Sequence, residues 1–354
     1  MYPAIGFVDV QVNGYVGVDF CSTGLTESDF CRAARALLKT GTVAFLPTVI
    51  TASVEEYAHV LPIIGKCIKK PEFADSILGI HLEGPFISSK PGAVGAHRPK
   101  YTRAPDPDFL QQLVEWSQDT VRLVTIAAEL PGAAELCRWC STREKRGVGR
   151  NIVVSLGHQL AGSAQMAALA AEGACMLTHL GNGMPNTVNR HHNPLLAGLS
   201  VPQLAAGIIA DGFHLPEHVL RVMLYCKGVD NLVAVSDMAP ICGCAPGAYD
   251  CLGTRVVLEE NFRVSEFGKD NLAGSGSTLT QCANVLRTTL RVRVVRRRVR
   301  ACVRALLPFR RATDFRCSLG LPVLSLCFCA CSSCADYLFI RAQRQSYGCE
   351  FLDM

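Results

Sequence analysis

The chain has 354 residues, of which 49% are hydrophobic, so it is long enough to bury a large apolar core. Its formal net charge is +5, but residues 288–354 contain twelve Arg, no Lys and four acidic residues, which leaves residues 1–287 slightly acidic. The basic charge therefore does not predict nucleic-acid binding by the larger part of the chain. The N-terminus lacks a secretory signal pattern, so we expect a cytoplasmic protein whose cysteines before residue 288 are reduced.

Short apolar segments alternate with helical patterns between residues 4 and 240. The apolar segments are residues 7–11, 43–48, 77–83, 121–129, 152–158, 175–180, 206–211 and 232–237. The helical patterns between them include residues 27–38, 54–69, 107–116 and 216–226. Eight such units predict an α/β fold, a (β/α)8 barrel of the TIM type. The alternative, a doubly wound open sheet, usually has a GxGxxG turn after its first strand, and residues 14–17 lack that spacing.

Most predicted strands end in a polar or ionisable residue, and the C-terminal strand ends form the active-site face of such a barrel. Glu83, His158 and His179 end three different strands, so they can converge on one point. One carboxylate and two neutral imidazoles with water form a catalytic zinc-type site, although other divalent ions have similar preferences. Asp237 ends the eighth strand, where it could take a proton from metal-bound water, whose pKa the metal lowers to about 7.

A single histidine at a strand end is more often structural than catalytic. Three ligands at successive strand ends, together with an aspartate on the eighth strand, favour a metal-dependent hydrolase instead. We expect Glu129, which also ends a strand, to have a structural role. We expect His81, one layer below Glu83, to support the site from the core.

Taken together, these motifs resemble the N-acetylglucosamine-6-phosphate deacetylases of the amidohydrolase superfamily over about residues 4–287. The matching segments are GFVDVQVNG (6–14), HLEGPFI (81–87), GAH (95–97), SLGH (155–158), THLGNGM (178–184), ADGFH (210–214) and VSD (235–237). HLEGPF together with THLxNxM is highly specific. The resemblance implies hydrolysis of the acetamide of N-acetylglucosamine 6-phosphate to glucosamine 6-phosphate and acetate, with Asp237 as general base and then acid toward metal-bound water.

The same resemblance implies roles for residues around the metal. His214 would contact the acetamide carbonyl and stabilise the oxyanion. Asn182 and Gly183 would offer amide groups to the sugar phosphate, and His97 and Arg190 would contact the phosphate. The loop that carries Arg190 could equally be a solvated loop. The family also implies a homodimer.

The first strand indicates how many metal ions to expect. Many amidohydrolases carry His-x-His there and bind two ions, whereas this chain has Gln11 and Asn13. Neutral amides are poor ligands for zinc, so we expect one divalent ion, zinc. The same pair argues against the alternative enzyme, another amidohydrolase acting on a cyclic amide.

Three features depart from the family pattern. The motif Asn-Gly-Met at 182–184 replaces Asn-Ala-Met, which we expect to loosen the loop. The chain begins just before the first barrel strand, without the first part of the family's accessory β-sandwich, and the pattern stops after Arg287. We therefore expect a barrel over residues 1–287, with the sandwich largely missing, and an atypical Arg- and Cys-rich tail over residues 288–354.

The tail has three open interpretations. The first is a translated intron or frame error. The second is a membrane span over residues 317–335, which carry no charge, although Pro322 weakens this interpretation. The third is a metal site formed by the closely spaced cysteines at 327–334. Loss of the sandwich would expose apolar surface and impair stability. A non-catalytic truncated product is therefore a second alternative function.

Overall fold

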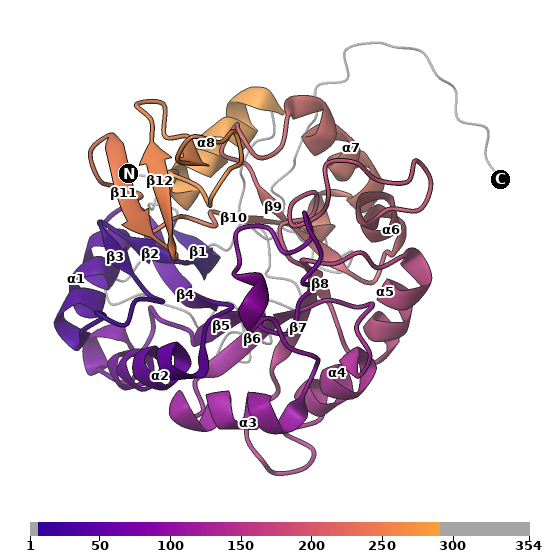
Figure 1. The fold of residues 1–354 in the computed structure, drawn as a ribbon, viewed down its shortest axis with the longest axis horizontal. Coiled ribbons are helices and arrows are strands. Elements are labelled where there is room, and N and C mark those ends of the chain that lie inside the picture. The colour runs from indigo at the N-terminus through magenta and orange to yellow at the C-terminus, as the bar shows by residue number, and fades with distance from the viewer. Residues whose placement is uncertain (1–5, 291–354) are drawn as a thin grey trace, which may run out of the picture.

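The computed structural model of the chain describes residues 6–290 (Figure 1). Eight parallel strands form one sheet in the order β1-β4-β5-β6-β7-β8-β9-β10. These are β1 (Phe7–Val12), β4 (Thr42–Ile50), β5 (Ile80–Glu83), β6 (Val121–Ile126), β7 (Val153–Leu156), β8 (Met176–Leu177), β9 (Ala205–Ile209) and β10 (Leu232–Val235). Each predicted apolar segment overlaps one of these strands, and the predicted TIM-type barrel is confirmed.

Helices surround the ring of strands on its outside (Figure 1). They are α1 (Glu27–Leu38), α2 (Val54–Ile68), α3 (Pro107–Trp116), α4 (Ala133–Ser141), α5 (Ser163–Ala171), α6 (Pro194–Ser200), α7 (Glu217–Lys227) and α8 (Leu279–Thr289), with 3-10 turns η1 (Pro71–Phe73), η2 (Pro99–Tyr101) and η3 (Val229–Asn231). Local sequence explains their boundaries. Ser53 and Glu56 form a capping box at the start of α2, and Thr26 caps α1.

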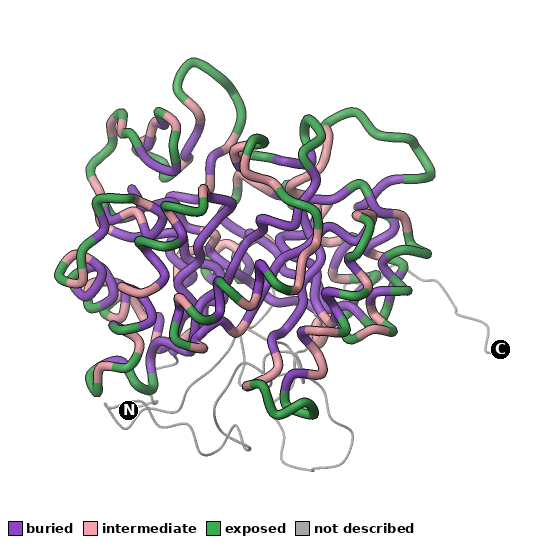
Figure 2. Tube along the Cα trace, turned by 60° about the horizontal axis from the view of Figure 1, so that its bottom comes forward, coloured by how far each residue is buried: buried purple, intermediate pink, exposed green. Residues whose placement is uncertain are grey.

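Apolar side chains form two layers of core, and the buried trace fills the centre of the molecule (Figure 2). A large cluster lies between the strands and the helices. A smaller cluster fills the barrel interior with residues such as Val10, Leu46, Leu123 and Val153. Most of its members precede the strand ends, so the polar residues that follow them are left at the carboxyl-terminal face.

The barrel closes between β1 and β10 without a continuous ladder in the described residues. One isolated bridge joins Val12 to Met238. The backbone N–H of Asp237 donates to the Gln11 carbonyl at 3.1 Å. The Asp9 carboxylate accepts hydrogen bonds from the backbone N–H groups of Gln11 (3.3 Å) and Ser236 (3.2 Å). We call residues 9–13 and 236–238 the β1–β10 seam.

Two small antiparallel sheets lie outside the barrel. One pairs β2 (Gly14–Tyr15) with β3 (Val18–Asp19), and the other contains β11 (Gly247–Cys251), β12 (Thr254–Leu258) and β13 (Val264–Glu266). The β11–β12 hairpin was not among the predicted strands, which stopped near residue 240. Its tip is attached to the barrel because the Leu252 N–H donates to the Asp19 carboxylate at 2.8 Å.

The described residues reach the end of α8 and include only residues 288–290 of the predicted tail. The three interpretations of the tail concern segments outside the described residues. Between residues 6 and 290, no helix combines the length and apolar character needed to cross a membrane.

Candidate metal centre and substrate cavity

Glu83, His158 and His179 lie together at the carboxyl-terminal face of the barrel. Glu83 is the last residue of β5, and the two histidines follow β7 and β8 by two residues. Glu83 Oε1 lies 3.2 Å from His158 Nε2 and 2.8 Å from His179 Nε2, and the two imidazole nitrogens are 3.1 Å apart. All three side chains are buried. The three predicted ligands therefore direct one atom each toward a single point.

The donor set fits a divalent cation. His158 Nδ1 lies 2.9 Å from the Ala93 carbonyl oxygen, so Nδ1 carries the proton and Nε2 keeps its lone pair toward Glu83. Burial raises the pKa of Glu83, but the close approach of the His158 and His179 rings outweighs burial and holds that pKa well below its usual value. An anionic carboxylate and imidazole lone pairs this close together repel one another unless a cation lies between them. Two nitrogens and one oxygen are a donor set that Zn²⁺ prefers.

His97 also reaches this centre, which the sequence did not predict. Its Nε2 lies 3.2 Å from His158 Nε2, and Glu83, His97 and His158 present ligand atoms within 4.8 Å of one another. However, His97 Nδ1 accepts the backbone N–H of Thr51 at 3.3 Å. Burial lowers the pKa of His97 to about 3, so the ring is neutral and its proton lies on Nε2. His97 therefore offers a hydrogen-bond donor to the site, whereas His158 offers a lone pair.

Three residues at the site have left-handed backbone conformations although they are not glycine. Their φ angles are 49° for His158, 27° for His179 and 49° for Asp237. Side chains other than glycine rarely adopt these values, and such strain gathers where function requires a particular side-chain direction. The turn that follows each strand thus aims the side chain across the mouth of the barrel.

Two glycines allow backbone to approach the His158 ring. A Cβ at Gly95 would lie 2.9 Å from His158 Cε1, and a Cβ at Gly183 would lie 2.9 Å from His158 Nδ1. Both glycines have positive φ angles, 57° and 61°. Gly183, which we expected to loosen its loop and to offer its amide to the sugar phosphate, is therefore packed against a candidate metal ligand.

The amides of the first strand contact carboxylates of the site. Gln11 Nε2 donates to Glu83 Oε1 at 2.9 Å, and Asn13 Nδ2 donates to Asp237 Oδ1 at 2.8 Å. Removal from water, with the negative charge of Glu83, raises the pKa of Asp237 to about 6, although His179, His214 and Asn13 act to lower it. Asp237 is therefore a carboxylate that can exchange a proton near neutral pH.

His214 forms a buried pair with Asp211, which the sequence analysis did not assign to the site. His214 Nδ1 lies 2.8 Å from Asp211 Oδ2, and the side chains are 7% and 2% exposed. Asp211 Oδ1 accepts the backbone N–H groups of Phe213 and His214. The signal available in the sequence was the spacing Asp-x-x-His directly after a strand.

A cavity of about 480 Å³ opens above these residues. The predicted residues that line it are Glu83, His97, His158, His179, Asn182, Gly183, His214 and Asp237. Arg190 does not line the cavity and is exposed. Among the described residues, the lining contains no Lys or Arg. Besides Glu83 and Asp237 it contains two acidic side chains: Glu266, which is paired with Lys269, and Asp270, which is paired with Arg263.

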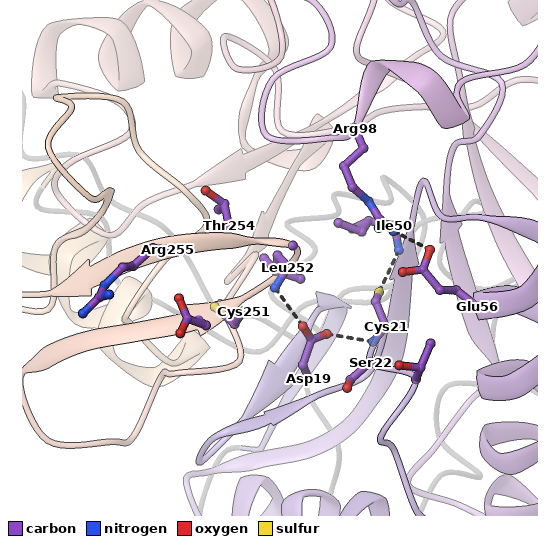
Figure 3. Close-up of a pocket in the computed structure, with 13 residues that line it drawn as sticks. Asp19, Cys21, Ser22, Ile50, Glu56, Arg98, Cys251, Leu252, Thr254 and Arg255 are labelled. Carbon is purple, nitrogen blue, oxygen red and sulfur yellow. Dashed lines mark hydrogen bonds and ion pairs between the residues drawn. The ribbon is translucent and has the colours of Figure 1, made fainter.

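A second cavity of about 480 Å³ lies beside the first, between the β11–β12 hairpin and the start of α2 (Figure 3). Ile50 and Leu252 line both cavities. In the second cavity Arg98 is paired with Glu56, and Asp19 holds the hairpin tip (Figure 3). Its lining contains none of the predicted site residues.

A chain of buried side chains lies beneath the candidate ligands. His81 Nε2 lies 2.8 Å from Thr125 Oγ1, which is 2.8 Å from Thr178 Oγ1, which in turn is 2.6 Å from Ser155 Oγ. Burial lowers the pKa of His81 to about 4, so its ring is neutral. This position matches the support role expected of His81. Glu129 accepts the Leu160 backbone N–H at 2.7 Å and does not line the site cavity, which matches a structural role.

Comparison with known proteins identifies close relatives, although no protein-family model matches the chain. The chain is 33% identical over 291 residues to N-acetylglucosamine-6-phosphate deacetylase from Caenorhabditis elegans, covering 78% of this chain and 66% of that protein. It is 35% identical over 289 residues to the Homo sapiens protein of the same name, covering 79% and 67%. The crystal structure of the Mycobacterium smegmatis protein of that name matches with a TM-score of 0.71 and 28% identity, covering 81% and 71%. The chain thus spans about two thirds of the length of these curated relatives.

Proposed function

The chain belongs to the N-acetylglucosamine-6-phosphate deacetylase family, and on that premise we propose that it hydrolyses the acetamide of N-acetylglucosamine 6-phosphate to glucosamine 6-phosphate and acetate. The observation that carries the proposal is the convergence of Glu83, His158 and His179, with Asp237 lining the same cavity. A cavity of about 480 Å³ is also within the range that holds small-molecule ligands.

Glu83, His158 and His179 would hold one divalent ion, which we assign as zinc. When bound, such an ion acidifies water and polarises the carbonyl group of a substrate. His179 is favoured over His97 as the third ligand because the His97 proton lies on Nε2. Gln11 and Asn13 already donate to Glu83 and Asp237, which argues against a second ion at the first strand and against a two-metal hydrolase of cyclic amides.

Asp237 moves the protons of the reaction. Asn13 holds Oδ1 of Asp237 at 2.8 Å, which leaves Oδ2 to accept a proton from the attacking water. The same oxygen then delivers that proton to the nitrogen of the departing amine as the carbon–nitrogen bond breaks. A pKa raised to about 6 suits a group that both accepts and donates a proton near neutral pH.

The remaining predicted residues bind the substrate. His214 faces the cavity and contacts the acetamide carbonyl, and the loop at Asn182 and Gly183 offers its amides to the sugar phosphate. For the phosphate we assign His97, which lines the same cavity, and Arg190, which lies on the exposed loop that continues from Asn186 in the cavity wall. We also propose that the chain forms a homodimer, in which the Arg190 loop of one copy approaches the other copy. We further propose a cytoplasmic location.

Acetate release tests the proposed function directly. Zinc-loaded protein is given N-acetylglucosamine 6-phosphate, unphosphorylated N-acetylglucosamine, or a cyclic ureide such as hydantoin. We expect one acetate per free amine from the phosphorylated sugar and much slower release from the unphosphorylated one. Turnover of the ureide alone would support the cyclic-amide alternative. No turnover by protein that binds one zinc ion would support the non-catalytic alternative.

A further inference from the structure

Asp211 and His214 form a unit at the end of β9, on the wall of the site cavity. The chain turns directly after β9, and this turn brings the Asp211 carboxylate against two backbone N–H groups, those of Phe213 (2.9 Å) and His214 (3.0 Å). Both hydrogen bonds reach the same oxygen, Oδ1. The other oxygen, Oδ2, is thereby turned toward the imidazole ring of His214, 2.8 Å from Nδ1.

This arrangement decides which ring nitrogen carries a proton. Asp211 is anionic at neutral pH: burial raises its pKa, but the hydrogen bond from His214 and the backbone N–H groups lower it to about 2. An ionised carboxylate can only accept hydrogen bonds, so Nδ1 of His214 must be the donor. Nε2 is then left as the ring atom available to the cavity.

We propose that Asp211 is a positioning residue for the hydrolysis: its anionic carboxylate, 2.8 Å from Nδ1, pairs with the doubly protonated ring of His214, whose second proton, on Nε2, is then directed at the acetamide oxygen as a hydrogen-bond donor. The proposal rests on the proposed function, which supplies the acetamide. No proton is transferred in this step. The Nε2–H bond remains intact, and the hydrogen bond strengthens as negative charge develops on the oxygen.

The same contacts allow a purely structural role, in which Asp211 only accepts hydrogen bonds from the two backbone N–H groups of its turn. The substitution Asp211→Asn separates these roles. Asparagine can keep its oxygen on the N–H groups of Phe213 and His214, so the turn is preserved. Its Nδ2 then faces His214 Nδ1 and donates to it, so Nδ1 carries no proton. The ring keeps only its Nε2–H and loses the positive charge that strengthens the hydrogen bond to the acetamide oxygen.

The first measurement is the tautomer of His214 by ¹⁵N NMR of zinc-loaded protein, which needs no substrate. We expect protonated Nδ1 in the unmodified protein and unprotonated Nδ1 in Asp211→Asn. Asp75→Asn, which makes the same chemical change at an exposed position, should leave the His214 signals unchanged. Identical His214 signals in the unmodified protein and Asp211→Asn would overturn the proposal, whether or not the chain is a deacetylase.

The second measurement is steady-state acetate release. We expect Asp211→Asn to lower kcat by about 10- to 100-fold with little change in KM, as is common for groups that act through another side chain. In a His214→Ala background the same substitution should have no further effect, because Asp211 acts through His214. Full activity of Asp211→Asn, or an equal loss in both backgrounds, would show that Asp211 only stabilises its turn.

Discussion

Glu83 is the last residue of β5, and His158 and His179 follow β7 and β8; each of these strands is hydrogen-bonded to a neighbour on both sides. Asp237 follows β10, which pairs with β9 on one side and meets β1 only at the seam. Around β5, β7 and β8, which we call the ladder side, regular parallel pairing fixes the positions of the strand ends that carry the candidate metal ligands. At the seam, the position of Asp237 is fixed by hydrogen bonds of the Asp9 and Asn13 side chains and by one isolated bridge.

The difference suggests that metal binding and proton transfer can be separated by substitution. Changes to the candidate ligands should remove the ion together with activity. Changes at the seam should alter catalysis or stability while the ion stays bound. The predictions that follow test this separation, beginning with the largest expected effect.

Glu83→Gln should cause the largest loss. The substitution replaces the only carboxylate among the three candidate ligands with an amide, which is a poor zinc ligand. Zinc binding should therefore weaken, and acetate release should fall by at least about 10³-fold. Zinc content by atomic emission and acetate release are measured on the same sample. Gln111→Glu on α3, away from the site, serves as a control for handling. An active, zinc-loaded Glu83→Gln protein would contradict the assigned ligands.

Asp237→Asn should lower kcat by about 10² to 10⁴-fold, because the amide cannot accept the proton of the attacking water. Zinc content should remain near that of the unmodified protein, since Asp237 lies on the seam and is not one of the assigned ligands. If zinc were lost in parallel with activity, Asp237 would have to be counted among the ligands and the comparison would fail.

Asn13→Ala should have an intermediate effect. Asn13 holds Asp237 Oδ1 and acts to lower the Asp237 pKa. Without it that pKa rises, so the ionised base is lost at a higher pH on acidification. We expect the acidic limb of the pH–kcat profile to move to higher pH and kcat to fall by about 10-fold. An unchanged acidic limb would show that Asn13 does not position the base.

Asp9→Asn should change stability more than activity. Burial raises the pKa of Asp9 to about 7, against 3.8 for the unperturbed group. Between these values the folded state binds the extra proton, so the free energy of unfolding should decrease as pH rises from about 4 to 7 and stay lower above pH 7. The neutral asparagine removes this contribution, which is on the order of a few kcal/mol.

Urea unfolding at several pH values measures this effect, with Asp75→Asn as the exposed counterpart. The Asp9→Asn protein should show a flatter pH dependence than either the unmodified protein or the control. Equal slopes in all three would mean that Asp9 ionises in the folded state much as it does in the unfolded chain.

Much of the ladder side could be predicted from sequence. Its strands are short apolar runs, and Glu83, His158 and His179 stand at their ends, so strand order alone brings them to one face. The seam could not be predicted in the same way. Asp9 reads as a polar residue within an apolar strand, and only the folded structure shows its contacts with Gln11 and Ser236.

Other features depend on contacts between segments that are distant in the chain. The role of His97 turns on a hydrogen bond from Thr51, and that of Asp211 on which oxygen its turn engages. Gly183 looked like a loop substitution until its contact with His158 was known. The β11–β12 hairpin was missed because its strands pair only with each other and with β13, outside the repeating pattern of the barrel.

The most direct test of the central claim is the position of zinc in a crystal of the zinc-loaded protein, located by anomalous scattering. We expect one ion bound by Glu83 and by Nε2 of His158 and His179 at about 2.0–2.2 Å, with His97 not coordinating and Asp237 adjacent. An ion bound by Glu83, His97 and His158 instead, or a second ion at Gln11 and Asn13, would contradict the account.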